Sequence, residues 1–491
     1  MKLPIHKTKI VCTIGPASRS EAVLERLLLQ GMNVARLNFA HGTLQEHSEN
    51  IRRIRAVAAG LKRSCMIMAD LPGPKIRIGK LLDEPLLLEK GNEVILTTAK
   101  GPAGAANQIP VEYRRLAESV SPGSLIFLND GFIQLQVERV SGEEVFCRTV
   151  IGGPLLSYKG LSLPGVKIFT DAVSNTDLKF VAFALEEGVD AFGVSFVEGE
   201  DDILKVKGFA QERGQAVYVV AKIERAEAID NFDAILFAAD AVMIARGDLG
   251  VQIPLEEVPP LQKKLINKAN LLGRPVITAT QMLLSMTENI RPTRAEVSDV
   301  ANAILDGTDA VMLSEETAIG RYPVETVEMI SKIAASAERE RKAIRALADL
   351  PAYFRTGAGS GNAGVEDVIT LNAVESANSL NVRYILTHTQ SKGTPCLISR
   401  FKPDCWILSC GGNAKTKNFL ALSYGVHPVS LDGETSCLAD KTINRLMTEG
   451  MVVPDDSVIW VEDELYDDSM EALSVKIIKT GTGFGISRSP V

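Results

Sequence analysis

The sequence predicts an α/β protein built on a (β/α)8 TIM barrel, with a small all-β lid domain inserted into the barrel and a separate α/β domain after it. Eight short apolar runs rich in β-branched residues alternate with helical patterns. Most runs start about 25 to 35 residues apart, but 126 residues separate the third start, Ser64, from the fourth, Asp190. A second alternation of strands and helices begins near Glu366. We therefore expect a barrel at residues 1–76 and 166–348, an insert at 77–165, a linker at 349–365 and a last domain at 366–491.

The first three barrel strands are expected at residues 8–14, 33–39 and 64–70. A helix capped by Ser20 follows the first, and another begins near Leu44 after the second. The remaining five strands are expected to begin near Asp190, Ala216, Ala241, Pro275 and Ala310. Two of the later helices are expected at residues 255–272 and 323–348.

The insert has the pattern of antiparallel β structure. Apolar runs at residues 125–128, 134–137 and 145–150 are separated by turn residues at 129–131 and 141–144. The insert leaves the barrel after the third strand, on the face where such barrels carry their active sites, so it could act as a lid.

The last domain is expected to contain strands at residues 384–387, 406–409, 458–461 and 475–479. A glycine-rich stretch, residues 357–364, precedes it. A phosphate-binding loop is one interpretation of these glycines, but no strand comes before them, so we interpret the stretch as a flexible connector.

Composition narrows the class of protein. The net charge is −8, which gives no electrostatic footprint for nucleic acid. No apolar stretch approaches eighteen residues, and the first residues lack the apolar core of a signal peptide. The seven cysteines do not have the spacing of a metal site. Their odd number and scattered positions are typical of a protein in a reducing compartment, where disulfides are rare. These observations predict a cytoplasmic enzyme with no membrane or nucleic-acid partner.

Polar residues follow six of the predicted barrel strands. On a barrel, the carboxyl ends of all strands meet at one mouth, where chemistry takes place. Lys222 and Glu224 project to the same side of the fifth strand, which alone could be an ordinary charged strand exit. The other polar residues at strand ends are Arg36, Asn38, Asp70, Asp248, Thr280, Gln281, Ser314 and Glu316. Together they favour an active site.

Six segments resemble motifs of the pyruvate kinase family, in the family's order and across the whole barrel. They are residues 217–225 (VYVVAKIER), 35–42 (ARLNFAHG), 73–77 (GPKIR), 245–250 (ARGDLG), 278–282 (TATQM) and 295–303 (AEVSDVANA). The resemblance implies transfer of the phosphoryl group of phosphoenolpyruvate to ADP, giving pyruvate and ATP, the final step of glycolysis. It also implies a homotetramer.

The resemblance assigns roles that the chemistry of each residue supports. Glu224 and Asp248 would hold Mg2+ or Mn2+ through hard oxygen ligands. Lys222 and Arg36 would bind the phosphoryl group, and Asp248 and the backbone of Gly247 would contact the substrate. Thr280 would lie near the carbon that is protonated, and the proton donor stays open. The residues implied at the nucleotide are Asn38, His41, Arg77 and, from the lid, Lys159.

One group of positions departs from the family's pattern. Many members hold K+ with an Asn, a Ser, an Asp and a Thr. Asn38 and Asp70 remain here, but Ala40 and Leu71 stand at the Ser and Thr positions, and Lys75 replaces a glutamate. A lysine ammonium could substitute for the monovalent cation, so we expect catalysis that does not require K+. The alternative is that Lys75 lies on the surface.

Family members often carry an effector site in the last domain. Residues 387–395 end a strand and begin a helix, for which we expect Thr394 as N-cap and Pro395 at the first helical position. Lys392, Arg400 and Lys402 would suit a phosphorylated effector. An ordinary capped helix explains the same residues.

Two rival functions can be compared with this one. A Mg2+-dependent carbon–carbon lyase on a similar barrel would not need a nucleotide clamp such as the lid and Lys159. A catalytically silent metabolite sensor would not need Lys222, Glu224, Asp248 and Thr280 together.

Overall fold

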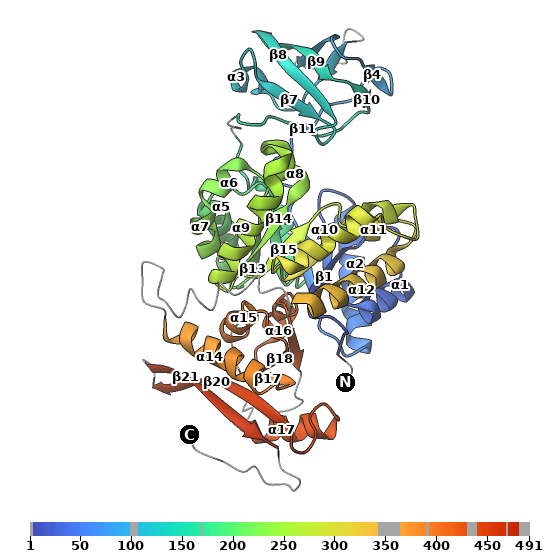
Figure 1. Cartoon of the computed structure of the whole chain (residues 1–491). Helices are drawn as coiled ribbons and strands as arrows, with labels where there is room; N and C mark the ends of the chain where they lie inside the picture. Colours follow the sequence, from blue (N-terminus) through green and yellow to red (C-terminus); the bar gives the residue numbers. More distant parts are fainter. Residues whose placement is uncertain are drawn as a thin grey trace.

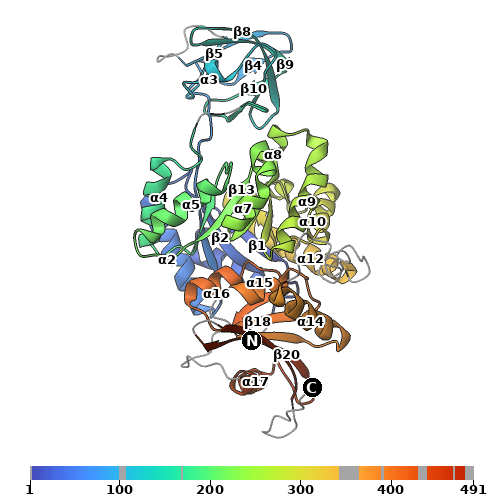
Figure 2. The same ribbon diagram turned by 90° about the vertical axis from the view of Figure 1, so that its left-hand side faces the viewer.

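The protein is described from a computed structural model over residues 3–98, 107–166, 168, 170–341, 364–388, 392–429, 439–467 and 470–480. Three blocks follow one another along the long axis of the molecule (Figure 1). The inserted β domain lies at one end, the barrel in the middle and the carboxyl-terminal domain at the other end, and a view turned by 90° shows the same order (Figure 2). The predicted linker lies outside the described residues except for its last two positions.

The central block is a closed barrel of eight parallel strands, in the order β1-β16-β15-β14-β13-β12-β3-β2. The strands are β1 (Lys9–Thr13), β2 (Met32–Asn38), β3 (Met66–Asp70), β12 (Ala191–Val194), β13 (Tyr218–Ile223), β14 (Ala241–Ala245), β15 (Val276–Ala279) and β16 (Ala310–Leu313). Each corresponds to a predicted strand, so the predicted barrel is confirmed. Most of their side chains are buried, because one side of each strand faces the barrel interior and the other faces the helices.

Helices surround this barrel and follow its strands. They are α1 (Glu21–Gln30), α2 (Leu44–Gly60), α4 (Asn175–Glu186), α5 (Glu200–Gln211), α6 (Ala226–Asp230), α7 (Phe232–Ala238), α8 (Arg246–Gln252), α9 (Val258–Leu271), α10 (Arg294–Leu305), α11 (Glu315–Ala318) and α12 (Pro323–Arg341). Two short 3-10 helices, η1 (Leu255–Glu257) and η2 (Leu284–Thr287), also lie in this block.

Ser20 caps α1 as predicted, accepting a hydrogen bond from the Val23 amide. The predicted helix 255–272 is divided into η1 and α9, and residues 342–348 of the other lie outside the described part. No helix among the described residues is long and apolar enough to cross a membrane.

The insert has its own sheets and its own apolar core. Its elements are β4 (Leu86–Leu88), β5 (Glu93–Thr97), β6 (Gln108–Pro110), α3 (Leu116–Ser119), β7 (Leu125–Leu128), β8 (Ile133–Ser141), β9 (Glu144–Ile151), β10 (Gly153–Leu155) and β11 (Leu161–Ser162). Asn129, Asp130 and Gly131 all have positive φ, as expected of the tight turn between β7 and β8. Arg77 pairs with Gly160 in an isolated bridge, so the chain enters and leaves the insert side by side. On this basis we propose residues 77–165 as the limits of the insert.

The carboxyl-terminal domain is a five-stranded sheet in the order β19-β18-β17-β20-β21, in which only β21 is antiparallel to its neighbour. Its elements are α14 (Val365–Ser379), β17 (Tyr384–His388), α15 (Gly393–Ser399), β18 (Trp406–Cys410), α16 (Ala414–Leu420), β19 (Val426–Val429), α17 (Ala439–Thr448), β20 (Ser457–Asp467) and β21 (Met470–Lys479). The sequence predicted four of these strands but not β19. This short strand contains Pro428, which cannot donate a ladder hydrogen bond and fits only at an edge.

Three aspartates join the barrel to this domain. Each stands directly before a barrel strand and accepts a backbone hydrogen bond from the neighbouring strand. Asp190, Asp240 and Asp309 accept from the amides of Ile67 at 2.7 Å, Val219 at 2.8 Å and Val276 at 3.0 Å, respectively. The other oxygen of each contacts the carboxyl-terminal domain, through Asn418, Lys392 and Lys402 in turn. These carboxylates therefore bind the barrel and the last domain at once.

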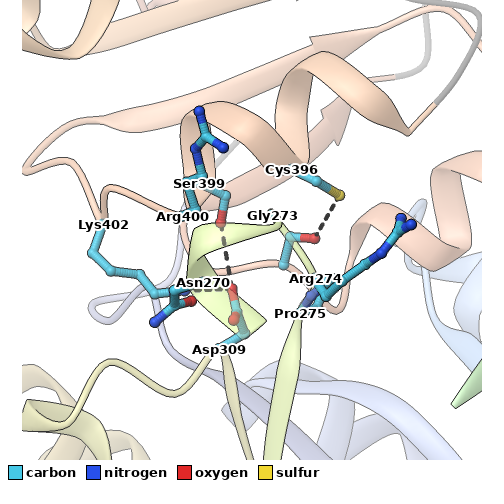
Figure 3. A pocket seen from close by; sticks show the side chains of 10 residues that line it. Asn270, Gly273, Arg274, Pro275, Asp309, Cys396, Ser399, Arg400 and Lys402 are labelled. Carbon is cyan, nitrogen blue, oxygen red and sulfur yellow. Dashed lines mark hydrogen bonds and ion pairs between the residues drawn. The ribbon is translucent and has the colours of Figure 1, made fainter. Parts of the chain in front are cut away.

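Two of the cations predicted for an effector pair with barrel carboxylates in this junction, and the third, Arg400, pairs within its own domain and donates to the Leu271 carbonyl of the barrel. Lys392 pairs with Asp240, Arg400 lies 2.8 Å from Asp367, and Lys402 lies 2.7 Å from Asp309. Arg400 and Lys402 are buried and line a small pocket, in which Asp309 contacts both Lys402 and Ser399 (Figure 3). This arrangement favours the structural interpretation of the three side chains over the effector site.

The predicted start of helix α15 was wrong. The helix begins at Gly393 with Lys392 at the N-cap position, so Thr394 is helical and Pro395 is the third helical residue. Proline is tolerated throughout the first turn, because the amide that it lacks would have no partner within the helix. Pro395 therefore indicates where the first turn lies, but it does not determine the residue at which the helix begins.

We expect Lys402→Met to destabilise the protein strongly. The Lys402 side chain is 0% exposed, and its removal would leave the buried Asp309 carboxylate without its cation. Breaking a buried pair in this way costs about 3–5 kcal/mol. Lys268→Met is the matched control, since Lys268 binds Asp233 in an exposed pair, for which about 0–1 kcal/mol is expected. Urea unfolding of both variants measures the difference, and equal midpoints would contradict it.

Candidate active site

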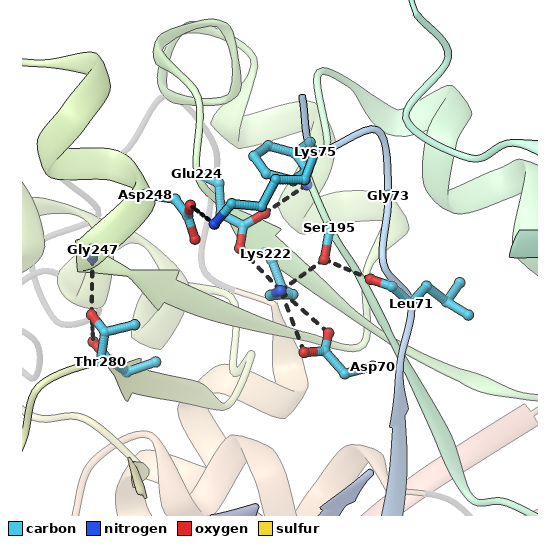
Figure 4. Close-up of polar contacts among 12 residues, drawn as sticks. Asp70, Leu71, Gly73, Lys75, Ser195, Lys222, Glu224, Gly247, Asp248 and Thr280 are labelled. Atoms are coloured by element: carbon cyan, nitrogen blue, oxygen red, sulfur yellow. Dashed lines mark hydrogen bonds and ion pairs between the residues drawn. The ribbon is translucent and has the colours of Figure 1, made fainter. Parts of the chain in front are cut away.

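The polar residues predicted at the strand ends converge on the mouth of the barrel that faces the insert. Arg36 and Asp70 come from β2 and β3, Lys222 and Glu224 from β13, and Asp248 from the start of α8. Figure 4 shows the last four of these within one cluster of polar contacts. Because the barrel strands are parallel, residues far apart in the sequence arrive at one place.

Lys222 lies at the centre of this cluster. Its Nζ donates to Ser195 Oγ at 2.7 Å and lies 3.3 Å from Asp70 Oδ1 and 3.0 Å from Glu224 Oε1. The side chain is nearly buried. Burial alone would lower the pKa of Lys222, but the charges of Asp70 and Glu224 outweigh burial and raise it. The ammonium therefore stays charged in a site with little water.

Arg36 is held beside Lys222 by a shared carboxylate. Its Nε donates to Asp70 Oδ2 at 2.7 Å, and another guanidinium nitrogen donates to Thr13 Oγ1 at 2.9 Å. Although burial would raise the pKa of Asp70, the charges of Arg36 and Lys222 hold it below its usual value. A side chain at Gly193, opposite Asp70 on β12, would meet Asp70 Oδ1 at 2.8 Å, so the glycine makes room for this carboxylate. One ionised carboxylate thus orients two cations.

Glu224 and Asp248 are the two carboxylates that the resemblance assigns to a metal ion. Glu224 is buried and accepts the Phe196 amide hydrogen bond at 2.7 Å. Burial raises the pKa of Glu224 against the effect of Lys222, and the charge of Asp248 raises it further. No group of three or more His, Cys, Asp or Glu side chains suited to a metal is found in the part of the chain that the structure describes. Two hard oxygen ligands fit Mg2+ or Mn2+, which keeps waters and binds substrate oxygens as well.

Lys75 contacts one of these two carboxylates, that of Asp248. Its Nζ is 3.2 Å from Asp248 Oδ1 and 3.9 Å from Asp130 Oδ1 on the insert. Asn38 and Asp70, which remain from the family's K+ site, lie on neighbouring strands, yet Asp70 is not among the ion-pair partners found for Lys75 in the described chain. The ammonium therefore lies at the mouth beside Asp248, whereas we expected it to substitute for a cation between Asn38 and Asp70.

Thr280 and Gly247 form a second group at the mouth. The Gly247 amide donates to Thr280 Oγ1 at 2.9 Å, and Oγ1 donates to the Ala279 carbonyl at 2.6 Å. Thr280 and Gln281 have φ values of 72° and 53°, a conformation that a β-branched residue such as threonine rarely adopts. Such backbone strain is common at functional sites.

The residues implied at the nucleotide lie at the rim of the mouth and the base of the insert. Asn38 ends β2, and His41 is exposed three residues later. Arg77 donates to the Tyr158 carbonyl at 3.0 Å, and the Lys159 carbonyl accepts the Ile78 amide at 3.0 Å. Arg77 and Lys159 are therefore neighbours on the two strands that connect the insert to the barrel.

Three further residues build this site, although no pattern in the sequence assigned them a role. Ser195 receives the Lys222 hydrogen bond and donates its own to the Leu71 carbonyl at 2.7 Å. Arg246 and Asp299 form an ion pair next to Thr280. Ser195 could have been found as a polar residue at the end of the fourth strand, and the other two lie within motifs that carry the resemblance.

Comparisons with known proteins agree with the geometry. Residues 5–327 match the family model for the pyruvate kinase barrel domain, and residues 367–477 match that for the pyruvate kinase alpha/beta domain. A pyruvate kinase of Thermococcus litoralis is 48% identical over 467 residues, which cover 94% of this chain and 96% of that protein. One from Staphylococcus epidermidis is 42% identical over 459 residues, covering 93% and 77%. The crystal structure of a pyruvate kinase from Cryptosporidium parvum has a TM-score of 0.87 at 33% identity, with 96% of each chain covered.

Proposed function

Because the chain belongs to the pyruvate kinase family, and is thus a phosphotransferase, we propose that it transfers the phosphoryl group of phosphoenolpyruvate to ADP. The observation that carries this proposal is the cluster in which Lys222 and Arg36 share Asp70. Phosphoryl transfer depends on positioning and on neutralising the charge of the transferred group. Two cations held rigidly at one carboxylate meet that need.

Each residue at the mouth has a proposed task. The planar guanidinium of Arg36 binds two phosphoryl oxygens, and Lys222 neutralises charge on the group during transfer and on the enolate oxygen. The Gly247 amide, which donates to Thr280 Oγ1 in this structure, would turn to the substrate carboxylate when the substrate binds. The Thr280 hydroxyl, fixed between Gly247 and Ala279, lies near the carbon that accepts a proton.

Glu224 and Asp248 would hold the divalent metal ion, Mg2+ or Mn2+. When bound, that ion polarises substrate oxygens and neutralises their charge. Asn38, His41 and Arg77 would bind the phosphates of ADP, and Lys159 would reach the nucleotide when the insert closes over the mouth. Arg77 and Lys159 lie together at the base of the insert, which supports a joint role at closure.

A coupled assay for pyruvate formation tests the proposed function. We expect pyruvate from phosphoenolpyruvate only when both ADP and Mg2+ are present. Pyruvate formed from oxaloacetate would instead indicate the lyase, and binding of metabolites without turnover would indicate the sensor.

We further propose that catalysis does not require K+, because Lys75 supplies a monovalent positive charge at the mouth. Activity in buffer free of K+ and Na+ is expected to be near maximal. Lys75→Glu should lower that activity and make it respond to KCl. The control is Lys80→Glu, which changes the charge of an exposed lysine in the same segment. A large activation of the unmodified protein by KCl would contradict the proposal.

The proposed assembly rests on the family alone, whereas the proposed location rests on the odd number and scattered positions of the cysteines. We propose a cytoplasmic homotetramer, which sedimentation at several protein concentrations would test. An effector in the carboxyl-terminal domain also stays a prediction, with fructose bisphosphate, a sugar monophosphate and AMP as candidates. Titrating each against the phosphoenolpyruvate saturation curve distinguishes them.

A further inference from the structure

The side chain of Arg246 lies directly behind the segment that carries Thr280. One guanidinium nitrogen donates to the Thr280 carbonyl at 2.8 Å, and Nε donates to the Ala279 carbonyl at 3.2 Å. Two consecutive carbonyl groups at the end of β15 are thus fixed by one rigid group. The next residue in the chain after Arg246 is Gly247, whose amide binds the Thr280 hydroxyl at 2.9 Å.

This support coincides with the strained backbone of the site. Positive φ at Thr280 and Gln281 is a strained backbone conformation for residues other than glycine, so surrounding contacts must hold the segment in place. The Thr280 hydroxyl would otherwise move when the segment relaxed toward ordinary φ values. Among the side chains described around the segment, Arg246 binds the carbonyl groups on both sides of the Thr280 Cα.

Asp299 holds Arg246 in this position. Its two carboxylate oxygens accept hydrogen bonds from the two terminal guanidinium nitrogens at 2.6 and 2.7 Å, which is the bidentate arrangement that fixes the plane of an arginine. Asp299 belongs to α10, which follows β15 in the chain and contributes no other predicted residue to the mouth. Helix α10, one of the helices that surround the barrel strands, therefore fixes the orientation of the Arg246 guanidinium behind the mouth.

We propose that Arg246, oriented by Asp299, is a positioning residue that fixes the Thr280 hydroxyl and the Gly247 amide for the reaction. The inference rests on the proposed roles of Thr280 and Gly247. Arginine is required because a lysine ammonium has no planar fork and could not serve the carboxylate and both carbonyl groups in one plane. Displacement of a catalytic group by about 1 Å can cost about 100-fold in rate.

A double-mutant cycle tests this proposal. Asp299→Asn keeps the shape of the side chain but weakens its hold on Arg246, so we expect kcat to fall about 10- to 100-fold with a smaller change in KM for phosphoenolpyruvate. In a Thr280→Ala background, the hydroxyl is already absent, so Asp299→Asn should lower kcat little further. Contacting residues that act through one another are non-additive in this way. Full additivity of the two losses, or unchanged kcat in Asp299→Asn, would overturn the proposal.

Two further variants separate positioning from general loss of structure. Asp367→Asn weakens another Arg–Asp pair, the one with Arg400 in the carboxyl-terminal domain, and its kcat should stay within a few-fold of the parent. Arg246→Lys keeps the charge and replaces Asp299→Asn in the cycle if the latter does not fold. The unmodified protein is assayed in parallel: if it forms no pyruvate, the proposed function fails, whereas an active parent with an additive cycle rejects only the role of Arg246.

Discussion

Lys222→Met is expected to abolish phosphoryl transfer while the protein still binds phosphoenolpyruvate and the metal. Methionine has a similar length but no charge, so the transferred group would lose the ammonium that Asp70 and Glu224 hold in place. Electrostatic groups placed where charge develops are worth about 100- to 1,000-fold in kcat or more. Arg36 would remain bound to Asp70 and would still contact the substrate. The measurements are kcat in the coupled assay and substrate binding by calorimetry.

Lys9→Met is the matched control for this variant. Lys9 is also a buried lysine on a barrel strand, but its Nζ binds the Val426 carbonyl at 2.6 Å, toward the carboxyl-terminal domain. Its replacement should lower the melting temperature and leave kcat within a few-fold. Comparable losses of kcat in both variants would indicate that Lys222→Met acts through folding. Substantial transfer by a folded Lys222→Met protein would contradict the role assigned to Lys222.

The barrel could be predicted because its strands have an unambiguous pattern. Runs such as Ala241–Ala245 are short, apolar and bounded by polar residues, and all of their side chains are buried. The same pattern fails for β19, where Pro428 and His427 interrupt the apolar run. An edge strand needs fewer ladder hydrogen bonds, so its sequence is under weaker constraint.

The individual residues at the mouth could be predicted, but their pairing could not. Lys222, Asp70 and Asp248 lie at or just after the ends of strands, and the backbone of a parallel barrel brings those positions to the mouth. The direction of a long flexible side chain is decided by local charges instead. Lys75 therefore reaches Asp248 rather than Asp70, whose carboxylate already holds Arg36 and Lys222.

Contacts between elements that lie far apart in the chain could not be predicted from the sequence either. Lys392, Arg400 and Lys402 resemble an anion site when only their charges are considered. Their partners, Asp240, Asp367 and Asp309, lie 152, 33 and 93 positions away in the chain, and no local pattern connects them. These buried ion pairs neutralise the charges that appeared to be available for an effector.

Glu224→Gln is expected to have the second largest effect, through the metal ion. The amide oxygen can still accept the Phe196 amide hydrogen bond, and Lys222, which loses its ion pair with Glu224, stays paired with Asp70. The loss of one of two carboxylates weakens a site that has few protein ligands, and a metal ion supplies several kcal/mol of charge stabilisation in such reactions. We therefore expect kcat/KM at a fixed low Mg2+ concentration to fall at least about 100-fold, since 1.36 kcal/mol corresponds to a factor of ten.

The dependence on Mg2+ distinguishes this effect from a general loss of activity. A weakened metal site should be partly restored by raising the Mg2+ concentration, whereas a distorted mouth would not. Glu338→Gln is the control, because Glu338 also accepts backbone hydrogen bonds, from Lys7 and Thr8, but contacts no residue of the mouth in the described structure. That variant should have an unchanged Mg2+ dependence. An unchanged Mg2+ dependence in Glu224→Gln itself would mean that the metal ion binds elsewhere, because neutralising a true ligand must weaken the binding of a hard divalent cation.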